Sequence, residues 1–350
     1  MAGRPGHEVL AADPAQQLLC VWCLEQAFKP AALVRGQMST PSHLAESELI
    51  GSSHAMAAVR NYVLKVAQSD ASVLISGPTG TGKELVADSI HRCSRRRSAP
   101  FVSVNCAAIP DSLLESELFG YERGAFTGAE EPYPGKLRLA DHGTVFLDEI
   151  SEMSPLGQAK ILRVLESREV FPLGGRRMVK VDVRFLAATN QELEPMIERH
   201  TFRQDLFFRL NVGRIFLPSL KERQEDILEL FLYYIRRFNA LQGRRVQAPS
   251  PELAERISDY DWPGNVRELR NCVEALFIDP PDGPIGLEHL PESFQRIFRS
   301  HRDDCVSERD AIVSALSRTN WNKKMAAREL QWSRMTLYRK LEKYKITGSH

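Results

Sequence analysis

The sequence predicts an α/β protein: a three-layer domain on a parallel sheet, then a small all-α subdomain and a basic helical tail. Apolar runs such as "ASVLISG", "PFVSVNC", "GTVFLDEI", "VDVRFLAATN" and "GRIFLPSL" alternate with helical stretches over residues 47–217. Runs with little polar alternation are typical of strands covered on both faces, as in a parallel sheet. Strands and helices alternating at this spacing predict a sheet with helices on both sides.

The strand pattern stops after Pro218. The segments "ERQEDILELFLYYIRRFNALQ", "SPELAERISDYD" and "NVRELRNCVEALFI" each predict a helix, and together they predict a helical lid over residues 218–278. The stretch "DPPDGPIGLEHLP" indicates a linker, which we place at residues 279–303 before a helical domain at 304–350. Residues 1–46 show no sustained periodicity, and we expect a short segment there without a complete sensory domain.

The composition of the 350-residue chain, 43% hydrophobic and 26% charged, is ordinary for a soluble globular protein. No apolar run approaches the roughly 20 residues of a membrane helix, and no signal-peptide pattern opens the chain. We therefore expect a cytoplasmic protein without a membrane partner. Six cysteines are too few and too scattered for a disulfide scaffold. Cys20 and Cys23 form a CxxC without a second ligand pair nearby, which argues against a zinc or redox centre.

The charge is distributed unevenly. Residues 318–345 hold nine Lys or Arg and two Asp or Glu, a net charge of +7 against −6 for the remainder of a chain whose total is +1. A basic tail on an acidic body indicates a small nucleic-acid-binding module at the C-terminus.

The segment "SVLISGPTGTGKE" places GxxxxGK directly after a predicted strand and before a predicted helix, the context of a phosphate-binding loop. Its glycines let backbone N–H groups point at phosphates, and the Lys83 ammonium suits the β- and γ-phosphate oxygens. Glu84 departs from the general pattern, in which Ser or Thr holds Mg²⁺. A glycine-rich turn without a nucleotide is the alternative. The expected nucleotide contacts here are Gly77, Pro78, Thr79, Gly80, Thr81, Gly82, Lys83 and Glu84.

Two adjacent carboxylates, Asp148 and Glu149, end the buried run "GTVFLDEI". Such a pair is costly to hold together unless a cation shares it. We expect Asp148 to hold Mg²⁺ through water and Glu149 to polarise the attacking water. A solvated acidic turn is the alternative.

The stretch "GYERGAFTGAEEPYPGK" places Phe126 and Thr127 between Gly124 and Gly128. Glycine loosens the backbone, and an exposed Phe costs solubility unless something binds it. The segment is either a mobile surface turn or a loop tip that contacts a partner.

The motifs "GPTGTGKELVADSIH", "FVSVNCAAIPDSLLESELFG", "GAFTGA", "GTVFLDEI", "FRQDLFFRLNV" and "DWPGNVREL" resemble the central AAA+ domain of bacterial sigma-54-dependent transcriptional activators. The resemblance covers residues 47–278 and continues into the tail. It implies an ATPase that uses ATP and Mg²⁺ and assembles from dimers into a hexameric ring. The implied partners are upstream enhancer DNA and the closed complex of sigma-54 RNA polymerase, which the ATPase converts into the open complex. Glu84 agrees with this family.

The resemblance also implies roles for single residues. The loop that grips sigma-54 is implied at Gly124, Ala125, Phe126, Thr127, Gly128 and Ala129. Asn105 is similar to the residue that pairs with Glu149 and couples hydrolysis to this loop. Thr189 and Asn190 resemble the sensor of the γ-phosphate, and Arg203 and Arg209 resemble arginine fingers that enter the neighbouring subunit's site. Arg267 matches a lid arginine that touches nucleotide, and Ile50 and Gly51 lie where the family holds adenine.

The tail is expected to form three helices, with Asn322 and Ser333 as N-caps of the second and third. In the third helix Leu337, Leu341 and Tyr344 share the inward face. The outward residues suited to a major groove and its phosphates are Ser333, Arg334, Thr336, Arg339, Lys340 and Lys343. A basic solvated helix is the alternative. The segment resembles the Fis-type helix-turn-helix, which binds paired half-sites as a dimer, although Gln331 and Trp332 depart from the usual turn.

Two other functions are alternatives to sigma-54 activation. An AAA+ machine with another client would lack both the GAFTGA loop and a terminal DNA-binding module. A DNA-binding AAA+ regulator that acts by occupancy alone would show losses at Lys83, Asp148, Glu149 or the fingers, and the chain retains all of them.

Overall fold

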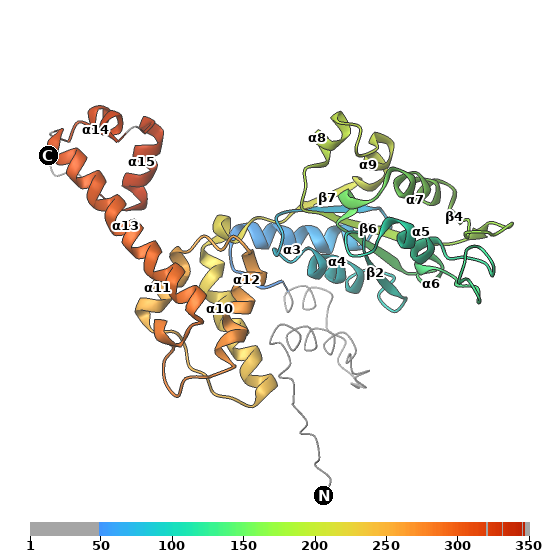
Figure 1. Ribbon diagram of the computed structural model, residues 1–350, viewed down its shortest axis with the longest axis horizontal. Coiled ribbons are helices and arrows are strands. Elements are labelled where there is room, and N and C mark those ends of the chain that lie inside the picture. Colours follow the sequence, from blue (N-terminus) through green and yellow to red (C-terminus); the bar gives the residue numbers. More distant parts are fainter. Residues whose placement is uncertain (1–48, 320, 331, 345, 347–350) are drawn as a thin grey trace, which may run out of the picture. The chain divides into compact units, whose positions relative to one another are not determined.

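The structure is a computed structural model, and it describes residues 49–319, 321–330, 332–344 and 346 (Figure 1). The expected N-terminal segment, with Cys20 and Cys23, lies outside the described residues. Within the described ranges no helix is long and apolar enough to span a membrane.

A five-stranded parallel sheet of order β2-β3-β6-β1-β7 forms the centre of the first domain. Its strands are β1 (Val73–Ser76), β2 (Phe101–Asn105), β3 (Thr144–Asp148), β6 (Arg184–Thr189) and β7 (Gly213–Phe216). In the strand register Ser76 lies opposite Thr189, and Asn105 lies opposite Asp148. The carboxyl ends of these strands therefore meet at one edge of the sheet, where the predicted site residues follow them.

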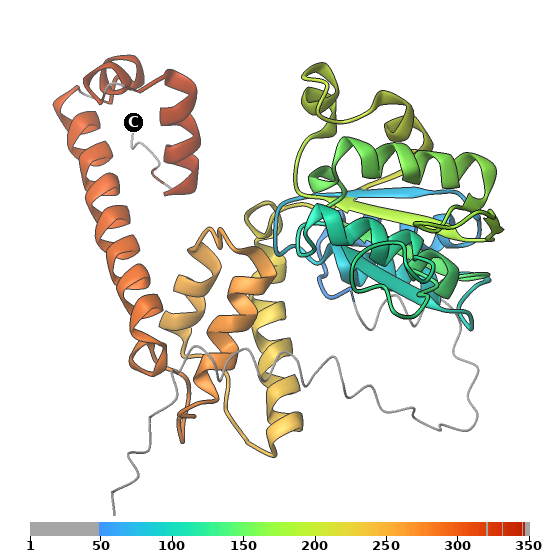
Figure 2. The same ribbon diagram turned by 45° about the vertical axis from the view of Figure 1, so that its right-hand side comes forward.

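Alternate residues of each strand enter two separate cores, because successive side chains in a strand point to opposite faces. Phe146 and Leu186 pack with α3 (His54–Ala67) and α4 (Lys83–Arg92). Leu147 and Ala187 pack on the other face. The helices of that second face are α5 (Asp111–Phe119), α7 (Pro155–Ser167) and α9 (Gln204–Leu210). Helices thus cover both faces of the sheet, and the expected three-layer class is confirmed (Figure 2).

Short elements complete this domain. They are α6 (Lys136–Leu139), η1 (Ile150–Glu152), α8 (Leu193–Glu198) and an antiparallel hairpin of β4 (Glu169–Val170) and β5 (Val179–Lys180).

The lid is helical, as expected. Its elements are η2 (Leu220–Arg223), α10 (Glu225–Gln242), α11 (Pro251–Asp259), α12 (Asn265–Leu276) and η3 (Leu287–His289). The Ser250 side chain caps α11 by accepting a hydrogen bond from the Leu253 amide. Trp262 is fully buried in the core of this subdomain.

The structure differs from the expected linker at residues 279–303, because a 27-residue helix, α13 (Glu292–Arg318), begins inside it. Phe294 and Phe298 pack against Trp262, with ring centroids 6.2 and 6.1 Å away. Burying these aromatic rings stabilises the start of α13 on the lid. The Pro- and Gly-rich stretch marks only the loop that precedes this helix.

The tail forms the three expected helices: the end of α13, α14 (Lys323–Glu329) and α15 (Arg334–Lys343). Both expected caps are confirmed: the Asn322 side chain accepts from the amides of Lys324 and Met325, and Ser333 accepts from Thr336. Leu337 and Leu341 are buried, and Tyr344 packs partly buried against the same core. The three-helix arrangement expected from the sequence is confirmed.

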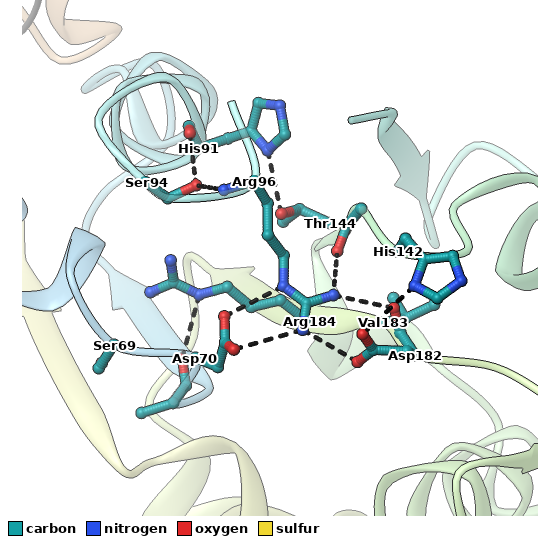
Figure 3. A network of polar contacts seen from close by, with 12 residues as sticks. Ser69, Asp70, His91, Ser94, Arg96, His142, Thr144, Asp182, Val183 and Arg184 are labelled. Carbon is teal, nitrogen blue, oxygen red and sulfur yellow. Dashed lines mark hydrogen bonds and ion pairs between the residues drawn. The ribbon is translucent and has the colours of Figure 1, made fainter. Parts of the chain in front are cut away.

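A network of arginines and aspartates closes the amino-terminal edge of the sheet (Figure 3). Arg96 donates to both Asp70 and Asp182, and this lowers the pKa of each carboxyl group. Arg184 is buried and donates to the carbonyls of Val66 and Ala71 at the end of α3 and just before β1. The network joins segments that precede different strands, and it lies at the end of the sheet opposite the site described next.

Candidate functional site

The glycine-rich loop between β1 and α4 folds around the side chain of Lys83. The Lys83 Nζ is buried and donates to the carbonyls of Gly77 at 3.0 Å and Pro78 at 3.4 Å. A Cβ on Gly77 would lie 2.5 Å from the Leu217 carbonyl oxygen, so only glycine fits there. Gly82 takes a left-handed φ of 104° as the N-cap of α4, so this helix begins at Lys83, as predicted.

Asp148 and Glu149 lie at the end of β3, beside Lys83. The Glu149 Oε1 is 3.7 Å from the Lys83 Nζ, and its Oε2 accepts a hydrogen bond from the backbone amide of Asn190 at 3.1 Å. Burial raises the pKa of Asp148, and the neighbouring Glu149 charge raises it further. The described residues hold no group of three or more His, Cys, Asp or Glu side chains arranged for a metal. A single desolvated carboxylate beside a phosphate loop nevertheless fits Mg²⁺, which takes one or two protein carboxylates together with substrate phosphates.

Asn190 links the carboxylates to the phosphate loop. Its Nδ2 donates to the Thr79 Oγ1 at 3.0 Å, while Thr189 contacts Ser151 Oγ at 3.1 Å. Asn105 lies at the same edge of the sheet, but its Oδ1 accepts from the amides of Ala107 and Ala108. The structure thus shows Glu149 bonded to Asn190 and Lys83, and it does not show the expected pairing with Asn105.

The lid contacts the phosphate loop directly. The Arg267 amide donates to the Gly80 carbonyl at 3.2 Å, and the Asn265 Nδ2 donates to the Thr79 carbonyl at 2.9 Å. A Cβ on Gly80 would lie 2.3 Å from the Gly264 carbonyl oxygen. This close approach explains why glycine is needed in the middle of the loop.

A cavity of about 450 Å³ extends from the phosphate loop toward the lid. Apolar side chains such as Ile50, Leu217 and Val266 line it together with Arg223 and Tyr234. A second hollow of about 200 Å³ shares part of this lining. The second hollow is lined by Thr79, Gly80, Gly82, Lys83, Glu84, Leu85, Asp148, Glu149, Tyr234, Val266, Arg267 and Arg270. A cavity with an apolar part, beside a glycine-rich hollow in which Lys83, Arg267 and Arg270 face the carboxylates, suits a nucleotide, with the base in the first and the phosphates in the second.

Three residues at this site were not predicted from the sequence: Arg223, Asp226 and Arg270. Buried Arg223 donates to the Thr81 carbonyl at 3.3 Å, and burial lowers its pKa. Buried Asp226 accepts from the Ser53 amide and hydroxyl at 2.8 and 2.6 Å, and it leaves no room for a Cβ on Gly51. Arg270 lines the phosphate hollow beside Arg267. The sequence feature that could have indicated Arg223 and Asp226 is their charge next to the apolar residues at the start of α10.

Arg203 and Arg209 are not part of this cluster in the single chain. Both are exposed, and they pair with Asp205 at 2.6 Å and with Glu166 at 3.5 Å. The buried Gln158 accepts from the Arg203 amide at 2.9 Å, so the backbone at Arg203 is fixed while its side chain reaches solvent.

The GAFTGA segment forms a tight loop between α5 and α6. The Gly124 amide donates to the Ala129 carbonyl at 2.9 Å, and both flanking glycines have positive φ. Phe126 is 44% exposed, with the edge of its ring against Tyr121. The loop is therefore closed by its own backbone hydrogen bonds, and it leaves the Phe126 ring partly exposed.

The β4–β5 hairpin lies beside this loop, and both extend past the end of the sheet (Figure 1). The Leu173 amide donates to the Gly120 carbonyl, and the Glu122 amide donates to the Leu173 carbonyl. A Cβ on Gly174 would lie 2.8 Å from the Cβ of Ala125. The loop and the hairpin are thus held together by backbone hydrogen bonds and close packing.

The residues that the sequence predicts to contact the major groove lie on α15, the predicted recognition helix, or at its N-cap. Ser333, Arg334, Arg339 and Lys343 are exposed, whereas Thr336 and Lys340 are half-buried. The Lys340 Nζ lies 4.9 Å from the centre of the Trp332 ring. The aromatic residue in the atypical turn therefore has a contact within this domain.

The raised pKa of Asp148 predicts a stability effect. A carboxyl group whose pKa is raised on folding destabilises the folded state when it is ionised, at pH values above its folded pKa. We expect Asp148→Asn to raise the Tm near neutral pH, and we expect the gain to disappear as the pH falls and the wild-type carboxyl becomes protonated. Thermal melts from neutral to acidic pH measure this difference in Tm, with Asp111→Asn at the start of α5 as the control. An unchanged or lowered Tm near neutral pH would contradict the burial argument.

Family comparisons match three consecutive parts of the chain. Residues 49–216 match the Sigma-54 interaction domain, residues 221–305 the AAA+ ATPase lid domain, and residues 306–344 the Bacterial regulatory protein, Fis family. The lid match includes the residues at which α13 begins.

Curated relatives are regulators. The chain is 43% identical over 307 residues to the transcriptional regulatory protein ZraR of Salmonella typhimurium, covering 85% of this chain and 69% of the relative. It is 42% identical over 308 residues to the Nif-specific regulatory protein of Klebsiella pneumoniae, covering 85% and 59%.

Solved structures agree with the fold. NtrX from Brucella abortus in complex with ATP is 34% identical, with a TM-score of 0.66 over 94% of this chain and 74% of that chain. Hsp104, at 16% identity and a TM-score of 0.51 over 69% of this chain and 46% of that chain, shares the fold alone.

Proposed function

Because the chain belongs to the family of sigma-54-dependent transcriptional activators, we propose that it binds upstream DNA and uses ATP hydrolysis to convert the sigma-54 RNA polymerase closed complex into the open complex. The observation that carries this proposal is the presence, in one chain, of the Lys83–Glu149–Asn190 cluster and the exposed Phe126 loop. Such an activator works in the cytoplasm, where the promoter DNA lies.

ATP fits the two joined cavities. The base would lie among Ile50, Leu217 and Val266, and the phosphates would lie on the loop amides and the Lys83 ammonium. Asp148 would hold Mg²⁺, which neutralises phosphate charge when it is bound. Arg267 and Arg270 add positive charge from the lid, so closing the lid on the phosphates would strengthen binding.

In this proposal Glu149 orients and polarises the attacking water. Its carboxylate is held by the Asn190 amide on one side and faces the Lys83 ammonium on the other. Because Asn190 also bonds Thr79 in the phosphate loop, a γ-phosphate that displaces this bond would shift Glu149 as well. We propose that this link reports the state of the nucleotide.

The fingers would act between subunits. Arg203 and Arg209 are exposed and lie outside the lining of the two cavities described above, so a neighbouring site in a ring would receive them. A finger stabilises charge on the transferred phosphoryl group. The proposed assembly is a homo-oligomer that grows from a dimer to a hexameric ring.

The projecting loop would contact sigma-54 through Phe126 and Thr127. It is joined by backbone hydrogen bonds to the β4–β5 hairpin, so a displacement of either reaches the other. The three-helix tail would anchor the assembly to upstream double-stranded DNA as a dimer on paired half-sites.

Complementation between subunits tests the ring. We expect Arg203→Ala to lower the rate of ATP hydrolysis about 1,000-fold, the scale of a lost arginine finger. A mixture of Arg203→Ala with Lys83→Ala should regain a substantial part of the activity, because an intact site on one chain meets an intact finger on the other. Wild-type activity per chain should also rise with protein concentration.

The matched control for this experiment is Arg296→Ala, since Arg296 is also exposed and paired with a carboxylate, Glu292, but lies on α13. It should retain full activity. Full turnover by a dilute monomer, or no recovery in the mixture although both variants oligomerise, would contradict the ring.

A further inference from the structure

The outward face of the recognition helix α15 has an apolar centre. Leu337 and Leu341 anchor the opposite face in the core of the tail. Met335 and Arg339 are four residues apart and therefore lie on one face, the one turned away from that core. Met335 is 78% exposed, more than Met325 at 59% on α14. Its face is hollowed, with a shallow depression of about 440 Å³ lined by Met335, Thr336, Tyr338, Arg339 and Glu342.

The lysines around this face are directed to its edges. The Lys323 Nζ lies 5.2 Å from the centre of the Tyr338 ring, and the Lys340 Nζ stacks on Trp332. These contacts place the flexible cations at the sides and leave the thioether at the centre. Glu342, two turns further along α15, is the acidic residue in the lining of the depression. Basic side chains flanking an apolar centre complement a surface that is anionic at its edges and apolar at one central point.

The major groove of DNA provides such a surface. Phosphates form its edges, and the C5-methyl group of thymine is the apolar feature among otherwise polar base edges. The first turn of a recognition helix contacts bases, and Met335 lies in the first turn of α15. A thioether cannot donate a hydrogen bond to a base edge, and it adapts readily to a methyl group.

We propose that Met335 reads a thymine by contact with its C5-methyl group, once in each half-site, with Tyr338 flanking the contact. This inference rests on the proposed DNA binding of the tail and names the base feature that the tail selects. Arg334 and Arg339 then supply phosphate or guanine contacts on either side of the methyl group.

Uracil substitution tests the methyl contact, because deoxyuridine differs from thymidine only in lacking the C5-methyl. The full-length chain is first used to select preferred duplexes from a random pool. Each thymine of the selected duplex is then replaced singly by deoxyuridine, and the Kd is measured at constant salt. We expect one position per half-site at which the substitution weakens wild-type binding about fourfold, the scale of one buried methyl group.

Met335→Ala should bind the thymine duplex about fourfold more weakly than the wild type does. Uracil substitution should not weaken its binding further. Met325→Ala, the same change on the neighbouring helix, should keep the full uracil penalty. Both side chains are exposed, so both variants should fold, and circular dichroism checks this.

Two results would overturn the inference: selective binding that no uracil substitution weakens, or a uracil penalty that persists in Met335→Ala. Absence of any sequence-selective binding by the wild type would instead refute the DNA-binding assignment on which the inference rests.

Discussion

Lys83→Ala is expected to abolish ATP binding and to lower hydrolysis by at least about 1,000-fold. The ammonium is buried within the phosphate loop, bonded to the carbonyls of Gly77 and Pro78 and 3.7 Å from Glu149. Removing it leaves the Glu149 carboxylate facing the phosphates without its cation, so anion binding becomes unfavourable. Titration with a fluorescent ATP analogue and a phosphate-release assay measure the two effects.

Two variants show whether this loss is specific. Lys65→Ala removes an exposed lysine of α3 and should bind and hydrolyse ATP like the wild type. Glu149→Gln should retain ATP binding but lose turnover, because the amide keeps the side-chain shape and cannot polarise the water. Turnover by Lys83→Ala within tenfold of the wild type would show that the phosphates bind elsewhere.

Phe126→Ala and Thr127→Ala are expected to separate hydrolysis from transcription. The described residues show no hydrogen bond between this loop and the phosphate loop, and its ring contact is with Tyr121. ATP hydrolysis should therefore stay within about twofold of the wild type. Capture of sigma-54 in the presence of ADP–aluminium fluoride should weaken in both variants. In Phe126→Ala it should weaken about 5- to 150-fold, because burying an aromatic side chain against a partner contributes about 1–3 kcal/mol.

A neighbouring apolar side chain of similar exposure is the control. Leu139 on α6 is 47% exposed, against 44% for Phe126, and Leu139→Ala should capture sigma-54 normally. If Phe126→Ala and Thr127→Ala both capture sigma-54 and activate transcription like the wild type, the segment is only a surface turn.

Much of the fold was predictable because its signals are local. Four strands of the sheet are apolar runs that end at a polar residue, and the fifth, β7, continues into Leu217 and Pro218. The caps at Asn322 and Ser333 depend on neighbouring amides. The two-residue strands β4 and β5 were not predicted, because two residues carry no periodicity. The start of α13 was also missed, since Phe294 and Phe298 are explained only by the distant Trp262.

The site residues also divide into those that a local sequence motif predicts and those that it does not. Lys83, Asp148 and Glu149 follow their strands directly, so their motifs place them at one edge of the sheet. Asp226 and Ser53 meet across 173 positions of sequence, and no local pattern reveals their hydrogen bonds. Asn105 shows the converse: its position was predicted, but its amide oxygen is occupied by the amides of its own turn.

The most direct test of the central claim is promoter opening in a purified system. A supercoiled plasmid carries a sigma-54 promoter preceded by duplex sites selected by this chain, and permanganate detects unpaired thymines in the closed and open complexes. We predict opening with the wild-type chain, sigma-54 RNA polymerase and ATP, and none when Glu149→Gln or a non-hydrolysable ATP analogue is used. Opening that proceeds equally well without hydrolysis, or bound sites that never yield an open complex, would contradict ATP-driven remodelling and favour regulation by occupancy alone.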